Sequence, residues 1–120
     1  MIAHIVLFTP KDTLDDASRR SFATEVVVAL RGISSVRRAF IGKQVSVDAG
    51  YERSFGDETY QFAAVVEFDD RAGLVDYLNS PLHNVLGRMF WENCSASVIC
   101  EVESADLDDP TALESLWRTT

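Results

Sequence analysis

The sequence predicts an α+β sandwich, in which a four-stranded antiparallel sheet carries helices on one face. Three observations lead to this prediction. Four apolar runs have the length of strands, and segments with helical spacing separate them in the order βα-β-βα-α-β. That order contains two β–α–β halves. The chain has 120 residues, 47% of them hydrophobic, which suits one domain with a single core.

The first predicted strand covers residues 2–9 and ends at Thr9-Pro10. Its alternation sorts the side chains onto two faces. One face carries Ile2, His4, Val6 and Phe8, and the other carries Ala3, Ile5 and Leu7. Both faces are largely apolar, which predicts a central strand covered on both sides. His4 is the exception, because a polar group in such a strand needs a partner or a cavity.

A helix is predicted over residues 13–31, with Asp12 or Thr13 as its cap and Gly32 at its end. Its apolar residues recur at helical spacing and form a stripe that faces the core. The stripe contains Phe22, Val26, Ala29 and Leu30. Three consecutive valines lower the helix propensity, so packing must stabilise this helix.

Residues 35–48 are the second predicted strand, in which Gly42 marks a kink. It is the one locally basic element, with Arg37, Arg38 and Lys43. These charges indicate an edge strand protected against aggregation. The alternative is a rim that binds an acidic substrate. The polar segment 48–59 is predicted to be a mobile loop, either a cover for a pocket or plain surface.

Residues 60–68 form the third predicted strand, and Asp69-Asp70 starts the helix that follows. Pro81 breaks this helix, because proline lacks a donor and disfavours α geometry in the residue before it. Ser80 then caps a new helix that has Pro81 as its first residue and runs to about Trp91.

The fourth strand, predicted at residues 97–103, completes a ferredoxin-like fold. A sheet that is apolar on both faces, with helices on only one, needs a second cover. The simplest cover is the sheet of a second copy, so we expect a homodimer in which the two sheets face each other.

The tail, residues 105–120, stands apart from the predicted domain at 1–104. It is acidic and contains a short amphipathic helix, with Asp109 as the cap. The apolar positions of that helix are Leu113, Leu116 and Trp117. A helix this short is unstable alone. We therefore expect it to dock, with the partner subunit as one candidate surface.

The charge balance, 11 basic against 19 acidic residues, gives a net charge of −8. This argues against nucleic acid as a partner, since phosphate binding needs a basic face. No secretory or membrane segment is visible. Cys94 and Cys100 have neither disulfide-scaffold nor zinc-site spacing. We therefore expect reduced thiols in a cytoplasmic protein without metal or cofactor.

His4, Tyr77 and His83 are the candidate catalytic residues. As the third residue of its helix, His83 lies where the helix N-terminus disfavours the imidazolium. A neutral His83 can take a proton from a C–H group between carbonyls. Tyr77 can donate a hydrogen bond to the enolate that forms, and His4 can orient His83 or hold a second substrate oxygen.

Four aromatic residues are candidates to line an apolar ligand pocket, although aromatics at such spacing usually belong to the core. They are Phe8, Phe62, Phe68 and Trp91. The three candidate catalytic residues also have a purely structural reading, as satisfied core or loop groups. A third reading is a metal held by the two histidines with Glu67 or Asp69, which matches no usual ligand spacing.

The chain resembles the stress-responsive A/B barrel (Dabb) family across about residues 2–104. The segments that carry the resemblance are His4–Phe8, Gly42-Lys43, Val65–Asp69, Asp76-Tyr77 and Pro81–His83. The resemblance implies a dimeric α+β barrel. Plant members of the family include metal-free polyketide cyclases, which are similar at His4, Tyr77, His83 and Phe90–Glu92.

Two functional hypotheses follow from the residues and the resemblance together. The first is a dimer that binds a small organic molecule in an apolar cavity, with cofactor-free cyclase- or lyase-like activity. The second is a non-catalytic stress-response or structural dimer.

Overall fold

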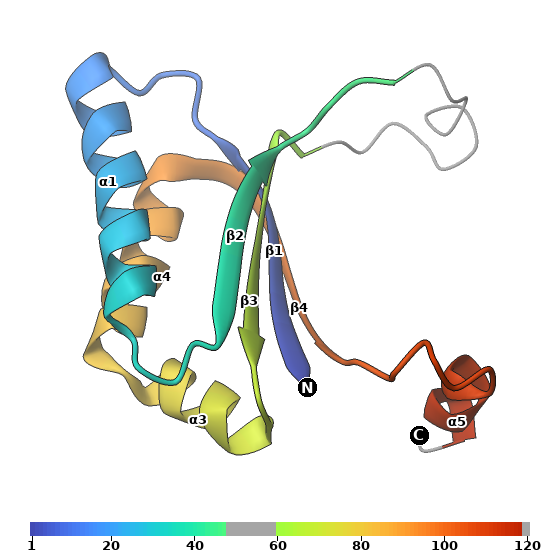
Figure 1. The fold of residues 1–120 in the computed structure, drawn as a ribbon. Coiled ribbons are helices and arrows are strands. Elements are labelled where there is room, and N and C mark those ends of the chain that lie inside the picture. The colour runs from blue at the N-terminus through green and yellow to red at the C-terminus, as the bar shows by residue number, and fades with distance from the viewer. Residues whose placement is uncertain (48–59, 119–120) are drawn as a thin grey trace.

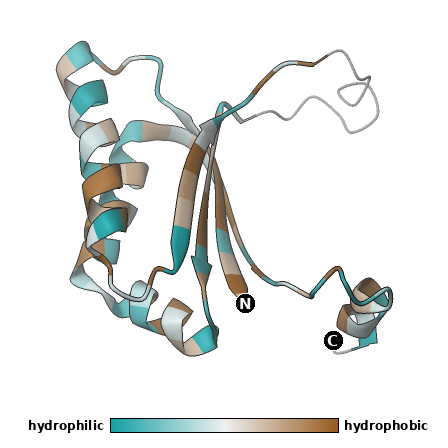
Figure 2. Ribbon diagram, in the orientation of Figure 1, coloured by the Kyte–Doolittle hydropathy of each residue, from teal (hydrophilic) through white to brown (hydrophobic). Residues whose placement is uncertain are grey.

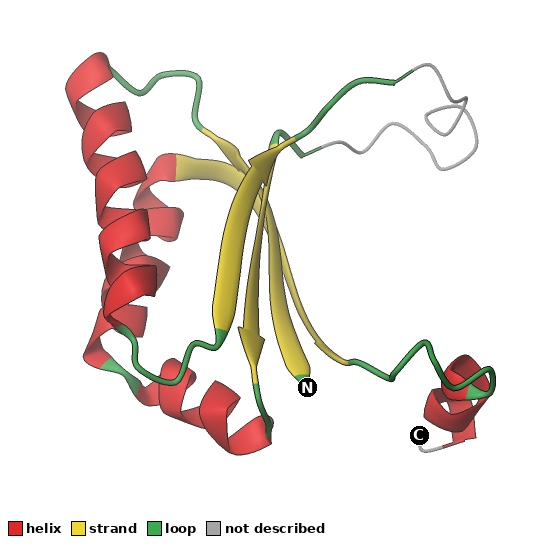
Figure 3. Cartoon of the chain, viewed as in Figure 1, coloured by secondary structure: helices red, strands yellow, loops and turns green. Residues whose placement is uncertain are grey.

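The computed structural model describes residues 1–47 and 60–118. Its elements are β1 (Ile2–Pro10), α1 (Asp16–Gly32), β2 (Arg38–Lys43), β3 (Phe62–Phe68), α3 (Arg71–Asn79), α4 (Pro81–Asn93), β4 (Cys94–Glu103) and α5 (Ala112–Arg118). The sheet and a layer made of α1, α3 and α4 form the body, and α5 lies apart from it (Figure 3). The predicted loop at 48–59 lies outside the described residues.

The sheet has the strand order β2-β3-β1-β4, and every neighbouring pair is antiparallel. β1 lies inside the sheet with β3 and β4 as its neighbours, which confirms the prediction of a central strand. β2 is an edge strand, as its charges indicated. None of the helices in the described residues is long and apolar enough to cross a membrane.

The core lies between the sheet and the helix layer. The face of β1 that carries Ile2, His4, Val6 and Phe8 is buried. Phe68 has no exposed surface, and the predicted stripe of α1 packs into the same cluster. Apolar segments are visible along β2 and along α1 in Figure 2. The layering follows from strand alternation and helical spacing, which turn apolar side chains to one side of each element.

Several predicted boundaries are wrong, beginning with those of the first helix and the second strand. α1 begins at Asp16, because the Asp15 carboxylate accepts a hydrogen bond of 2.7 Å from the backbone N–H of Ser18 and caps the helix. Asp12 and Thr13 therefore precede the helix. The second strand is shorter than predicted and pairs without a register shift across Gly42, so the expected kink is absent.

The fourth strand begins three residues earlier than predicted, at Cys94, directly after α4. Its register against β1 shifts between Thr9 and Pro10, because Pro10 has no N–H to donate to the ladder. The early start sets which residues of β4 lie opposite β1. His4 is paired with Glu101.

Within residues 1–47 and 60–118, no layer of helices or strands covers the second face of the sheet (Figure 1). We call it the open face. Its side chains alternate with those of the buried face, so Leu7 of β1 shares a row with Ala63 and Val98 of the neighbouring strands. Large apolar residues on it are exposed, namely Leu7, Phe40, Val98 and Val102. Such a patch is typical of an interface.

Candidate functional site

A pocket of about 470 Å³ lies between α4 and the helix-facing side of β1 and β4. One end is polar and is formed by three aromatic side chains, His4, Tyr77 and His83. The other end is mostly apolar. Its residues include Leu86, Phe90, Trp91, Cys94, Ser97 and Ile99. The pocket therefore offers hydrogen-bonding groups at one end and an apolar wall at the other, which is the usual composition of a small-molecule site.

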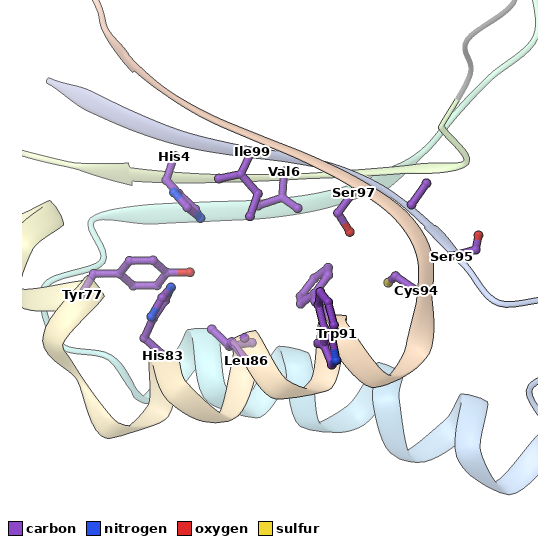
Figure 4. A pocket seen from close by; sticks show the side chains of 13 residues that line it. His4, Val6, Tyr77, His83, Leu86, Trp91, Cys94, Ser95, Ser97 and Ile99 are labelled. Atoms are coloured by element: carbon purple, nitrogen blue, oxygen red, sulfur yellow. The ribbon is translucent and has the colours of Figure 1, made fainter.

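Three separate elements bring the polar residues together. The ring centroids of His4 (β1) and Tyr77 (α3) are 5.3 Å apart, and those of Tyr77 and His83 (α4) are 4.9 Å apart. The two imidazole centroids are 6.5 Å apart. In Figure 4 the Tyr77 hydroxyl and the ring nitrogens of both histidines point toward one shared space. One small molecule can reach all three groups there.

The helix break between α3 and α4 sets the positions of Tyr77 and His83. The backbone N–H of Ser80 donates to the Tyr77 carbonyl at 3.1 Å and closes α3. The Ser80 hydroxyl oxygen accepts from the N–H of Leu82 at 3.2 Å and caps α4, whose first residue is Pro81. The predicted cap and the predicted break are both confirmed. These two hydrogen bonds fix the one-residue connection at Ser80, which turns both side chains toward β1.

Replacing Ser80 with alanine is expected to lower the free energy of unfolding by about 0.5–2 kcal/mol, the usual effect of losing a helix cap. Urea unfolding followed by circular dichroism measures this. The matched control is Ser21→Ala, on the exposed side of α1, where alanine should be neutral or slightly stabilising. Equal effects of the two substitutions would contradict the role of Ser80.

His4 has a charged partner that the sequence did not reveal. Its Nδ1 lies 2.7 Å from a carboxylate oxygen of Glu101. The imidazole is buried, whereas the Glu101 side chain is 41% exposed. A carboxylate accepts hydrogen bonds, so the contact assigns Nδ1 as the ring nitrogen that faces Glu101 and Nε2 as the ring nitrogen that this contact does not use.

The site holds Tyr77 and His83 in their neutral forms. Burial, and to a smaller extent the charge of Glu101, raise the pKa of Tyr77 to about 12. The phenol therefore keeps its proton at neutral pH and is a hydrogen-bond donor. Burial first, and the nearby His4 second, lower the pKa of His83. The direction agrees with the prediction from the helix start, but burial is the main cause.

The lowered pKa of His83 predicts a loss of stability in mild acid. Below about pH 6.5 the unfolded chain binds this proton more readily than the folded chain does, so the free energy of unfolding falls as pH falls. In His83→Gln this contribution is absent. We expect a smaller loss of stability for the variant between about pH 7 and about pH 5.5, measured by urea unfolding. Identical losses would contradict the prediction.

The predicted pocket aromatics separate into two groups. Trp91 lies at the pocket and is 86% exposed. Phe8 and Phe62 stack on each other in the core, with ring centroids 5.4 Å apart. Phe68 is fully buried behind Tyr77. These three phenylalanines do not line the pocket, because the helix layer covers them. Phe90 does line it.

The structure does not assemble the metal ligands considered above. The Glu67 carboxylate accepts two hydrogen bonds of 2.9 Å from Arg38, and alternation along β3 places it on the open face, away from His4. Across residues 1–47 and 60–118, no three His, Cys, Asp or Glu residues form a metal-binding group. Burial raises the pKa of Cys94, so its thiol stays protonated at neutral pH and is a weak nucleophile.

The fold and the pocket together define a ferredoxin-like α+β protein with a histidine–tyrosine site between sheet and helix. The chain belongs to the Stress Responsive A/B Barrel Domain (Dabb) family, whose profile matches residues 2–104. The tail with α5 lies outside that match. Among curated proteins, none matches the chain significantly.

Solved structures with this fold support the assignment. A Dabb family protein from Mesorhizobium loti has 22% identity and a TM-score of 0.69, covering 88% of this chain and 97% of its own. A dimeric ferredoxin-like protein of unknown function from Thermobifida fusca has 22% identity and a TM-score of 0.64, covering 84% and 88%. The hydroxynitrile lyase of Passiflora edulis has 16% identity and a TM-score of 0.69, covering 88% and 95%.

Proposed function

We propose that this protein is a homodimer whose pocket binds a small neutral carbonyl compound and catalyses cofactor-free acid–base chemistry of the cyclase or lyase type. The observation that carries the proposal is that His4, Tyr77 and His83 meet at one end of the pocket. The likeness to a hydroxynitrile lyase, which has the same fold, supports a lyase among the candidate reactions.

The homodimer is proposed from the open face. In the dimer, the exposed apolar side chains of two sheets pack against each other and leave water. Stacked sheets lie about 10 Å apart, so both layers of side chains interdigitate. Dimeric ferredoxin-like neighbours support this arrangement. The catalytic pocket lies on the other side of the sheet, so each protomer keeps its own site.

In the proposed cyclase step, His83 takes a proton from a carbon between two carbonyl groups. The Tyr77 hydroxyl donates a hydrogen bond to the carbonyl oxygen on which the negative charge collects. The enolate carbon then attacks a second carbonyl of the same molecule and forms a C–C bond. The new alkoxide recovers the proton from the His83 imidazolium, so protons and charges balance.

The lyase step uses the same groups in the opposite direction. His83 removes the proton of a hydroxyl group, and the adjacent C–C bond breaks as the carbonyl forms. The leaving carbon or cyanide takes the electron pair and then the proton. In this step the Nε2 of His4, which is not used in the contact with Glu101, forms a hydrogen bond with a second polar group of the substrate.

The charges around the pocket favour a neutral substrate. Among the residues that the structure describes, no lysine or arginine lines it. The Glu101 carboxylate lies behind His4 and is partly exposed, so it repels an anion that enters the polar end. Carboxylate-bearing analogues should therefore bind more weakly than their neutral esters or amides.

The test is a panel of neutral poly-β-ketones, aryl β-hydroxy ketones and aryl hydroxynitriles, with products separated by chromatography. We expect saturable turnover by the natural chain in at least one class. Turnover by no class above the buffer rate, while the compounds bind, would contradict the catalytic proposal. It would favour the second candidate function.

That second candidate is a non-catalytic dimer that binds a ligand or acts in a stress response. The observation that favours it is the bond between His4 and Glu101, which already satisfies the buried imidazole. On this reading, the three rings are a packed wall of the core, with His4 held by Glu101. Binding without turnover separates this candidate from the enzyme.

A further inference from the structure

The acidic tail carries large apolar side chains that are exposed to solvent. Leu107 is 91% exposed, Leu113 is 72% exposed and Trp117 is 75% exposed. Leu113 and Trp117 are one helical turn apart and share a face of α5. α5 has seven residues, too few to be stable without packing. This face of α5 therefore calls for a docking surface.

A second apolar feature lies at the far edge of the sheet. α1 and the edge strand β2 form a groove of about 210 Å³. Its lining residues are Val27, Leu30, Arg31, Ala39, Phe40 and Ile41. Val27 and Ile41 are exposed, whereas strand alternation places the Phe40 side chain on the open face of the sheet. Five of the six residues are apolar, and Arg31 supplies a positive charge.

The two features have opposite charges at their borders. Five acidic residues belong to or precede α5, namely Glu103, Asp106, Asp108, Asp109 and Glu114, against the basic Arg118. The groove has Arg31 at its wall. Arg38 at the start of β2 and Arg37 just before it lie beyond the groove, and each already has an acidic neighbour, Glu67 and Asp69 respectively. Opposite charges around a small apolar contact favour one partner and one orientation.

Within one chain the two features lie far apart. β2 and β4 are the opposite edges of the sheet. α5 lies on the side of the open face, whereas α1 lies on the other side of the sheet (Figure 1). The partner that the tail can meet on the open-face side is the second protomer of the proposed homodimer.

A two-fold axis parallel to the strands places each β4 edge over the β2 edge of the partner. The levels along the strands also agree. Glu103, at the end of β4, is paired with Ile2 of β1. Arg38, at the start of β2, is paired with Glu67 of β3, and Glu67 is paired in turn with Ala3, the neighbour of Ile2. Both ends therefore lie at the same end of the sheet. Rotation about this axis does not shift either end along the strands, so the acidic tail of one protomer comes to the basic start of β2 in its partner.

We infer that α5 of each protomer docks in the α1–β2 groove of the other protomer, with the Leu113 and Trp117 side chains in the groove. The eight residues between Glu103 and Ala112 can span up to about 26 Å when extended. That length exceeds the spacing of two stacked sheets, about 10 Å. The inference rests on the proposed homodimer and adds a second, tail-mediated contact to it.

Disulfide trapping tests the inference. Leu113→Cys and Val27→Cys are combined in a chain that carries Cys100→Ser, because Cys100 is exposed on the open face. We expect a covalent dimer under mild oxidation, with the link between positions 113 and 27 found by peptide mass spectrometry. The matched control replaces Val27→Cys with Ala17→Cys, about 15 Å away along α1, and should not form the link.

Light scattering on the same protein separates the two proposals. A dimer that forms no interchain link, or a link within one chain, overturns the tail docking and leaves the homodimer intact. A monomer overturns both. As a second measurement, Leu113→Asp should raise the dissociation constant of the dimer at least about tenfold. Ser115→Asp, two residues away on α5, should leave it unchanged, and equal effects would also overturn the docking.

Discussion

Replacing His83 with alanine is expected to lower the turnover of a responsive neutral carbonyl substrate by about 10²–10⁴-fold, the usual contribution of a general base. The reason is that the neutral imidazole at the start of α4 is the proposed proton acceptor, and alanine offers none. The measurement is the initial rate for the natural chain and the variant at saturating substrate.

The variant should keep the fold, because the His83 side chain is only half-buried. The hydrogen bond from His83 to the Ser80 carbonyl is donated by the backbone N–H, which alanine retains. Near-identical circular dichroism and melting curves at neutral pH provide the control. Tyr77→Phe offers a graded comparison, since it removes one hydrogen-bond donor and should cost about 10²–10³-fold. A fully active His83→Ala would exclude this residue as the base.

Replacing Leu7 with aspartate is expected to separate the homodimer. Leu7 lies on β1, one of the two inner strands of the sheet, and its side chain is exposed on the open face. In the dimer the new carboxylate would be buried without a partner, which costs about 3–5 kcal/mol at such sites. The dissociation constant should therefore rise between about a hundredfold and several thousandfold. Sedimentation or light scattering across a dilution series measures it.

The control for this experiment adds the same charge elsewhere. Thr24→Asp, on an exposed position of α1, should leave the dimer unchanged. A Leu7→Asp chain that is folded and still dimeric at low concentration would show that the sheets are not the interface.

The layering of the fold follows from local patterns in the sequence. Alternation in residues 2–9 identifies the buried face of β1, and Ser80-Pro81 identifies the helix break. Both patterns depend on short-range geometry. They also place His4 on the buried face of β1, and Tyr77 and His83 on either side of the helix break. For these features a single sequence is sufficient.

The parts that the sequence could not predict depend on how distant segments meet. Glu101 joins the site because β4 pairs with β1 in one particular register, which the early start at Cys94 sets. Strand alternation assigned Phe8 to the same face as His4, which is the buried face. It could not tell that helices would cover the rings of Phe8 and Phe68 and leave Trp91 at the pocket.

The central claim is that one neutral carbonyl ligand contacts both histidines. The chain has two histidines, so nitrogen-15 NMR of the imidazole rings reports on His4 and His83 alone. Adding a neutral aryl β-diketone should shift both rings along one binding curve, and its carboxylate analogue should shift them far less. Signals that stay unchanged at excess ligand, or a shift of one histidine only, would contradict the account.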